Sequence, residues 1–291
     1  MIILDNVNFS YSAGAKTLNN ISVKFENGKT YAVIGQSGSG KSTLLKHLNG
    51  LLKPQSGTVT VNGTKITSKT DMKAICAQVG IVFQYPEHQL FAETVFDDIA
   101  FGPRNLGFGE DEVKGLVKSA MNAVSLSETL CGRSPFKLSG GEKRRAAIAG
   151  VLAMNPQTLV LDEPSAGLDP TAAADLYKFL KSFGSERTII IASHSMEEAA
   201  ELADEIIVLS NGRIILSGTP SDIFSNAEKI QKAGLALPQT TELIMNLRHC
   251  GFDIEPSYTL EETEKNIVRL RASRLNGAGG GNRTRNLSLG S

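Results

Sequence analysis

The sequence predicts an α/β fold with a parallel-sheet core, an antiparallel β subdomain, an inserted helical subdomain and a small C-terminal α+β or helical extension. Short apolar strands separated by glycine-containing turns fill the first 80 residues. Helical periodicity dominates from about residue 93 to 154, and strands alternate with helices from 158 to 209. The helical segment is therefore expected as an insertion in the α/β core.

Composition narrows the class of protein. The 291 residues allow one large domain with an appendage, and 41% hydrophobic with 21% charged residues are typical of a globular chain. Thirty basic residues balance thirty acidic ones, so we expect no nucleic-acid partner. No segment reaches the roughly 18 apolar residues of a membrane helix. We expect a cytoplasmic protein whose contact with a membrane goes through a partner.

The N-terminal third contains a strand, a glycine-rich loop and a helix in that order. Strands are expected at 2–4, 21–25 and 58–61, with hairpin turns at Asn27-Gly28 and Asn62-Gly63. A buried strand at 30–34 runs into the loop, and residues 41–48 have apolar positions at helical spacing. This order is the context that a phosphate-binding loop requires.

The loop itself matches the pattern G-x-x-x-x-G-K-[ST]. Its glycines allow backbone N–H groups to point at phosphates, supported by the N-terminus of the following helix. Lys41 supplies a charge for the β and γ oxygens, and the Ser42 hydroxyl suits Mg²⁺. The candidate nucleotide-binding residues of this phosphate loop (residues 35–43) are Gly35, Gln36, Ser37, Gly38, Ser39, Gly40, Lys41, Ser42 and Thr43.

Two carboxylates end an apolar strand expected at 158–161. Alone, Asp162 and Glu163 could equally be solvated acids at a strand end. After a phosphate loop, Asp162 is expected to reach Mg²⁺, usually through water, and Glu163 to polarise the attacking water. The remaining core elements are expected as helices at 97–100, 110–124, 141–152, 172–183 and 196–202 and strands at 188–192 and 205–209.

The segment Leu138-Ser-Gly-Gly-Glu142 resembles the signature of the ATP-binding cassette (ABC) family, and the likeness spans about residues 2–220. It implies an ATPase with ATP and Mg²⁺ as ligands. It also implies that Ser139, Gly140 and Gly141 act on ATP held mainly by a different subunit. Glu142 stands where glutamine is commoner in the family. We expect activity to survive this departure, because Ser139 and the two glycine backbones meet the phosphate.

Four further residues fit the same pattern. Gln84 resembles the Q-loop glutamine that senses Mg²⁺ and the γ-phosphate, which adds it to Ser42 and Asp162 as a candidate magnesium residue. Asp169 resembles the end of the D-loop, which crosses the dimer interface, and His194 resembles the switch histidine that contacts the γ-phosphate. Tyr11 resembles the aromatic that stacks on adenine, although it could equally be a core or edge aromatic.

Residues 84–91 (QYPEHQLF) resemble the Q-loop continuation of energy-coupling factor (ECF) transporter ATPases. The segments 46–54, 99–103, 145–153 and 237–243 are similar to the same group, most of all to the second of its two paired ATPase subunits, over about residues 1–270. One phosphate loop, one signature and no heptad arm exclude tandem-cassette translation factors and coiled-coil chromosome ATPases. The lack of a spanning helix excludes fused exporters.

This resemblance implies a heterodimer with a sister ABC ATPase, peripheral at the cytoplasmic face of the cell membrane. The dimer would dock on a transmembrane coupling protein, which joins a substrate-binding membrane subunit for a vitamin or metal ion. The surface near residues 85–91 and the helical segment would receive a coupling helix. Two alternatives stay open: a conventional homodimeric importer ATPase, and a non-transport ABC ATPase.

The expected domains are a nucleotide-binding domain at 1–220, with its helical subdomain at about 90–155, and a C-terminal extension at 221–272. The extension is expected to form helices at 223–233, 240–251 and 260–270, and it is a candidate dimerisation domain. Residues 273–291 lack periodicity and are rich in Gly, Asn and Arg, which predicts a disordered or spurious tail.

Overall fold

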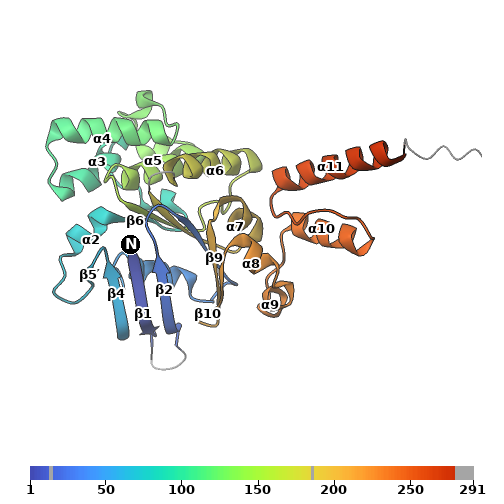
Figure 1. Ribbon diagram of the computed structural model, residues 1–291. Coiled ribbons are helices and arrows are strands. Elements are labelled where there is room, and N and C mark those ends of the chain that lie inside the picture. The colour runs from blue at the N-terminus through green and yellow to red at the C-terminus, as the bar shows by residue number, and fades with distance from the viewer. Residues whose placement is uncertain (13–15, 185–186, 279–291) are drawn as a thin grey trace, which may run out of the picture.

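Two β-sheets organise the computed structural model, which describes residues 1–12, 16–184 and 187–278 (Figure 1). The antiparallel sheet has the strand order β2-β1-β4-β5. The larger sheet has the order β10-β9-β3-β8-β7-β6 and is parallel except for the β9–β10 pair. Its strands are β3 (Thr30–Ile34), β6 (Val79–Val82), β7 (Thr158–Asp162), β8 (Thr188–Ser193), β9 (Glu205–Ser210) and β10 (Arg213–Gly218).

The antiparallel sheet consists of β1 (Ile2–Phe9), β2 (Leu18–Phe25), β4 (Ser56–Val61) and β5 (Thr64–Lys65). Asn62-Gly63 joins β4 to β5 as an antiparallel hairpin, as predicted. The hairpin expected at Asn27-Gly28 is wrong, because this turn carries the chain from β2 in one sheet to β3 in the other. Glycine at position 28, with φ +75°, makes the tight turn without placing β2 and β3 in register.

The helices divide into a core set, an inserted set and a C-terminal set. The inserted helices α3, α4 and α5 gather at one end of the molecule, whereas α8 to α11 lie on another side (Figure 1). The helices are α1 (Lys41–Leu48), α2 (Met72–Gln78), α3 (Val95–Leu106), α4 (Glu110–Ala123), α5 (Gly140–Leu152), α6 (Pro170–Gly184), α7 (Met196–Leu202), α8 (Pro220–Phe224), α9 (Ala227–Lys232), α10 (Gln239–His249) and α11 (Leu260–Ala278).

The central parallel strands β3, β7 and β8 of the larger sheet are buried on both faces, as is usual in a parallel sheet. On β7, Val160 faces a cluster that contains α1 and the antiparallel sheet, whereas Leu159 and Leu161 face the helices α3 to α6. This alternation follows the two-residue period of a strand. The α/β class with an antiparallel subdomain and an inserted helical subdomain is thus confirmed.

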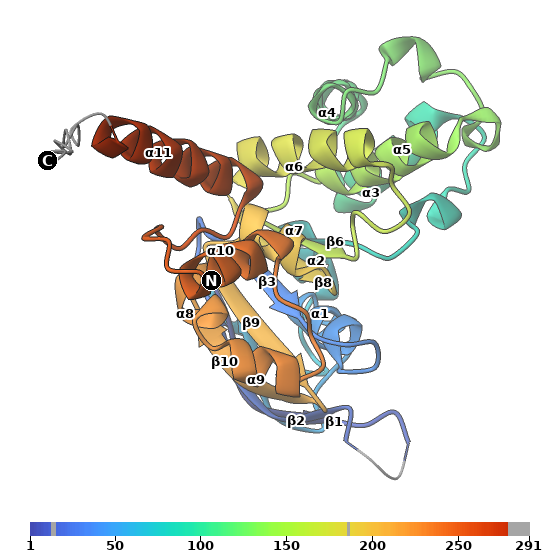
Figure 2. The ribbon, with the colours of Figure 1, turned by 90° about the vertical axis from the view of Figure 1, so that its right-hand side faces the viewer.

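The C-terminal extension packs on the opposite side of the nucleotide-binding core from α3 to α5. In Figure 2, α8, α9 and α10 lie in front of β9 and β10, and buried residues of α8 and α9 join those of β3, β9 and α7 in a third cluster. The helix expected at 223–233 is interrupted between α8 and α9. Helix α11 continues to Ala278, so the expected start of the tail at 273 falls within a helix; residues 279–291 lie outside the described residues.

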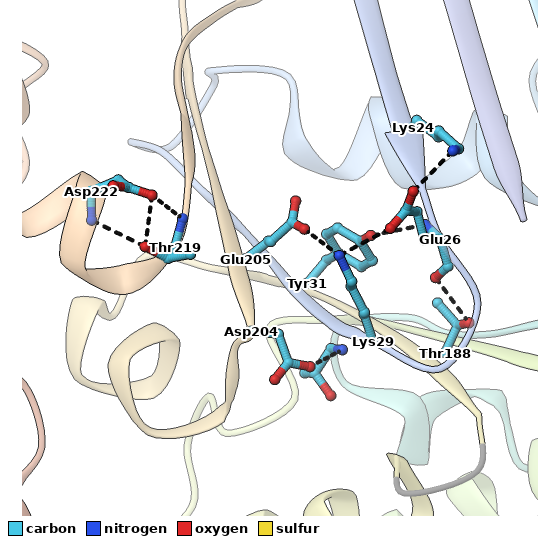
Figure 3. Close-up of polar contacts among 10 residues, drawn as sticks. Lys24, Glu26, Lys29, Tyr31, Thr188, Asp204, Glu205, Thr219 and Asp222 are labelled. Carbon is cyan, nitrogen blue, oxygen red and sulfur yellow. Dashed lines mark hydrogen bonds and ion pairs between the residues drawn. The ribbon is translucent and has the colours of Figure 1, made fainter.

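A polar cluster fixes the amino-terminal ends of the strands (Figure 3). Lys29 forms ion pairs with Glu26 and Glu205, and the backbone N–H of Thr30 donates to Asp204. Hydrogen bonds and ion pairs from Lys24 and Lys29 lower the pKa of Glu26 to about 2. This cluster lies at the edge of the sheet away from the phosphate loop and therefore has a structural role.

Candidate functional site

The candidate site lies at the carboxyl edge of the larger sheet. Strands β3, β7 and β8 are parallel neighbours, and β6 flanks β7. The phosphate loop follows β3, Gln84 lies two residues after β6, Asp162 ends β7, and His194 follows β8. Because parallel strands end at the same edge, residues that are distant in sequence meet there. The structure thereby brings together the predicted phosphate, magnesium and switch residues.

The phosphate loop depends on its glycines. Gly38 and Gly40 have φ of +79° and +108°, a region that side chains disfavour. A Cβ at Gly35 would lie 2.3 Å from the carbonyl oxygen of Leu209, so no larger residue fits there. The Lys41 ammonium is buried in the loop, where its Nζ donates to the carbonyl of Gly35 at 2.7 Å and to that of Gln36 at 3.3 Å. The lysine charge therefore sits inside the phosphate cradle.

Asp162 has the surroundings of a magnesium residue. Its side chain is buried, and its Oδ1 has no hydrogen-bond partner among the described residues. Burial raises the pKa of Asp162, while hydrogen bonding with Ser42 acts in the opposite direction. An unpartnered buried carboxylate oxygen is costly unless a cation or water satisfies it. The donor set of Asp162 and Ser42, both oxygen ligands, fits Mg²⁺.

Glu163 is held between two other predicted site residues. Its Oε2 accepts a hydrogen bond from Nδ1 of His194 at 2.6 Å, and its Oε1 lies 3.7 Å from Nζ of Lys41. Its backbone has φ +51°, and the Glu163 N–H donates to the carbonyl of Ala192 on β8. Such strained backbone in non-glycine residues is concentrated at functional sites. The strained turn directs the carboxylate toward the phosphate loop.

Gln84 and Tyr11 lie at the margins of this site. Both are exposed, Tyr11 to 61%. The Tyr11 hydroxyl lies 3.2 Å from Oγ1 of Thr43 in the phosphate loop, and its ring packs edge-on against Phe9. This excludes a core position for Tyr11 and leaves its ring beside the loop, where an adenine would find an open aromatic face.

The signature residues belong to the inserted subdomain instead. Ser139 is the N-cap of α5, and Gly140 and Gly141 form its first turn with exposed, unobstructed Cα positions. Glu142 completes a capping box: its Oε2 accepts from the Ser139 N–H and hydroxyl, both at 2.8 Å. Glu142 therefore stabilises the start of α5. The backbone N–H groups of Gly140 and Gly141 lie at the N-terminus of this helix.

Arg144 is a functional candidate that the sequence analysis missed. It is only 6% exposed, its Nη1 donates to the carbonyl of Ala166 at 2.7 Å, and its Nη2 donates to that of Glu163 at 3.4 Å. It thus joins helix α5 to the segment that follows Glu163, the predicted general base. The sequence offers two adjacent arginines, and only the packing of α5 distinguishes Arg144 from Arg145.

The predicted D-loop ends in a helix cap. Oδ1 of Asp169 accepts hydrogen bonds from the N–H groups of Thr171 and Ala172, both at 3.0 Å. This fixes the start of α6, a role that the sequence prediction did not include. One oxygen of the Asp169 carboxylate is therefore bonded within its own chain.

Glu198 of α7 is buried, and neither of its carboxylate oxygens has a hydrogen-bond partner among the described residues. This burial raises the pKa of Glu198. The neighbouring Tyr177 has its pKa raised to about 12, first by its own burial and then by the charge of Glu198. Glu198 therefore resists ionisation in the folded chain.

This environment predicts a pH-dependent effect of Glu198→Gln. Because the folded pKa lies above the unfolded value, the native state loses stability as the pH rises through 4.5, at which the unfolded carboxyl is half ionised, toward the folded pKa. Glutamine cannot ionise, so the variant should gain more in Tm over the unchanged chain at pH 8 than at pH 5. Differential scanning calorimetry at both pH values measures this, and an equal difference at the two would contradict it.

Comparison with known proteins identifies the family. The model of the ABC transporter family matches residues 18–166. An EcfA2 protein, the energy-coupling factor transporter ATP-binding protein of Caldanaerobacter subterraneus subsp. tengcongensis, is 48% identical over 276 residues, which cover 92% of this chain and 96% of that protein. The chain belongs to the ABC transporter family. The predicted resemblance to the ABC family, and within it to the ECF transporter ATP-binding subunits, is confirmed.

A further relative and two solved structures support the same family assignment. EcfA2 of Clostridioides difficile is 47% identical over 92% of this chain and 97% of its own length. The structure of cbiO1 from Clostridium perfringens, described as part of the ABC transporter complex cbiONQ, has a TM-score of 0.72 and 38% identity, covering 84% of this chain and 98% of that one. The ATP-binding cassette MJ0796, described as a dimer bound to ADP and Pi, has a TM-score of 0.69 and 26% identity, covering 76% of this chain and 99% of that one.

Proposed function

We propose that this chain is the ATP-hydrolysing subunit of an ECF-type importer and that it pairs with a sister ABC ATPase. The observation that carries the proposal is the division of the site. The phosphate loop, Asp162, Glu163 and His194 meet at one edge of the sheet, whereas Ser139 and the signature begin a helix of the inserted subdomain. A second subunit would bring its signature to the first site.

In the proposed reaction, Lys41 and the loop N–H groups hold the phosphates of ATP. Glu163 orients and polarises the attacking water, and His194, bonded to Glu163, faces the γ-phosphate. Ser42, Asp162 and Gln84 would hold Mg²⁺, which when bound neutralises charge on the β and γ oxygens. Tyr11 would stack on the adenine.

A groove on the inserted subdomain supports the docking of a membrane partner. Its volume is about 360 Å³, and it is lined by residues of α2, α3 and α5 and of the adjoining segments, including Leu90, Phe101, Ala147 and Met154. Phe91 and Phe101 are 59% and 50% exposed and pack edge-to-face with ring centroids 4.9 Å apart. An exposed aromatic pair at an apolar groove is typical of a protein interface. We propose that a helix of the transmembrane coupling protein occupies it.

Phe101→Arg tests this assignment. We expect the tagged variant to lose most membrane partners on detergent purification, by about tenfold or more, because a buried charge would oppose the partner's apolar helix. Ile215→Arg, at an exposed position on β10 at the opposite edge of the sheet, is the matched control. Quantitative mass spectrometry of the co-purified proteins gives the result. Equal recovery by both variants, or isolation of the unchanged chain only as a soluble monomer, would reject the proposal.

The remaining assignments extend the same proposal. The chain would lie at the cytoplasmic face of the membrane, and along residues 1–12, 16–184 and 187–278 no helix has the length and apolar character of a membrane span. The substrate-binding membrane subunit would select the vitamin or metal ion. Exposed apolar residues of the extension, among them Leu243, Leu260 and Val268, support its role in dimerisation of the two ATPases.

A further inference from the structure

A side chain of the phosphate loop forms a hydrogen bond to the C-terminal extension. Nε2 of Gln36, the second residue of the loop, donates a hydrogen bond to the carbonyl oxygen of Gly234 at 2.8 Å. Gly234 lies in the turn between α9 and α10, 198 residues further along the chain. The extension is therefore in direct contact with the loop that holds the phosphates.

The turn at Gly234 is a rigid element. The N–H of Gly234 donates to the carbonyl of Gln231 at 2.8 Å, and that of Leu235 donates to the carbonyl of Ile230 at 3.1 Å. These two bonds form a Schellman motif at the end of α9, and Leu235 and Ile230 are buried in the same cluster. The motif leaves the Gly234 carbonyl free to accept from Gln36.

The same turn is anchored beneath the loop. Leu235 and Leu237 are buried in a cluster with Ile34, the last residue of β3 before the phosphate loop, and with Met196 of α7. Packing at this density transmits small displacements between neighbours. The position of the Gly234 carbonyl is therefore set relative to both β3 and the helix that follows His194.

Gln36 also organises the interior of the loop. Its carbonyl accepts from the Ser39 N–H at 3.1 Å and from Nζ of Lys41 at 3.3 Å. The side chain of Gln36 is thus held by the extension, while its backbone orients a loop N–H and the lysine charge. A displacement of the Gln36 side chain would therefore act on the residue whose backbone carbonyl binds Ser39 and Lys41.

Gly234 is the residue that permits the contact. Its φ is +72°, and a Cβ there would lie 2.0 Å from Nε2 and 2.8 Å from the amide carbon of Gln36. The glutamine amide is the end of a flexible side chain, so an alanine at 234 would displace it rather than unfold the turn. We propose that Gly234 is a positioning residue for the phosphate loop, through which the C-terminal extension tunes the affinity for ATP.

Gly251 supplies a matched control within the same extension. It ends α10 in another Schellman motif, with Gly251 N–H bonded to Arg248 and Phe252 N–H bonded to Leu247. Its φ is +83°, and a Cβ at this position would meet no other atom within 4 Å. Gly234→Ala and Gly251→Ala therefore introduce the same backbone strain, and only the first displaces Gln36.

Isothermal titration of the full chain with ATP and Mg²⁺ tests the proposal. Gly234→Ala and Gln36→Ala should each raise the Kd by about threefold to fivefold, the effect of one lost hydrogen bond, and the double variant should be no weaker than either single one. Gly251→Ala should leave the Kd unchanged, and Gly234→Ala, which also loses the hydrogen bond to Gln36, should lower Tm at least as far as Gly251→Ala.

Three results would overturn the inference: equal Kd values for Gly234→Ala and Gly251→Ala, weakening by Gln36→Ala alone, or multiplied effects in the double variant. The inference depends on one part of the proposed function, which is that the phosphate loop binds ATP. Failure of the unchanged chain to bind ATP would reject the proposed function and this inference together, which distinguishes that case from the other three.

Discussion

Replacing Glu163 by glutamine is expected to reduce ATP hydrolysis by about 10²- to 10⁴-fold, the usual contribution of a general base. The glutamine carbonyl can still accept the hydrogen bond from Nδ1 of His194, so the strained turn after β7 should persist. Loss of a negative charge 3.7 Å from Nζ of Lys41 removes repulsion of the γ-phosphate, so ATP should bind at least as tightly.

Phosphate release by the assembled complex and calorimetric titration with ATP and Mg²⁺ measure the two effects separately. Glu112→Gln, the same change at an exposed position of α4, is the control and should leave both values unchanged. Turnover by Glu163→Gln within about tenfold of the unchanged complex would exclude Glu163 as the base.

The core of the site could be predicted because its residues lie at the ends of strands or shortly after them. The expected strand at 30–34 and the helices at 41–48 and 196–202 have the observed bounds. Since Asp162 and His194 adjoin apolar strands, the parallel order alone places them together. Local pattern and sheet topology give the same answer here, so no long-range information was needed.

The parts that the sequence did not predict depend on packing between distant segments. The turn at Asn27-Gly28 has hairpin composition but connects two sheets. The contact of Gln36 with Gly234 joins residues whose neighbours in sequence indicate nothing about each other.

The signature allows a test of the divided site, because its residues can be changed without touching the phosphate loop of the same chain. Gly141 is the second residue of α5, it is exposed, and a Cβ there would meet only Nη1 of Arg145, at 3.6 Å. An acidic residue in the first turn of a helix is favourable by about 0.3–1 kcal/mol through the helix dipole. Gly141→Asp should therefore fold normally.

Gly141→Asp should nevertheless lower ATP hydrolysis by the complex about 10²-fold or more, because its carboxylate would repel the γ-phosphate that the sister subunit presents. The isolated chain should bind ATP with unchanged affinity, since its own site does not use its own signature. Gly109→Asp, at the unobstructed N-cap of α4, is the matched control and should hydrolyse normally. Weakened binding by isolated Gly141→Asp would place the signature in its own chain's site, and normal hydrolysis by the complex would remove it from the reaction altogether.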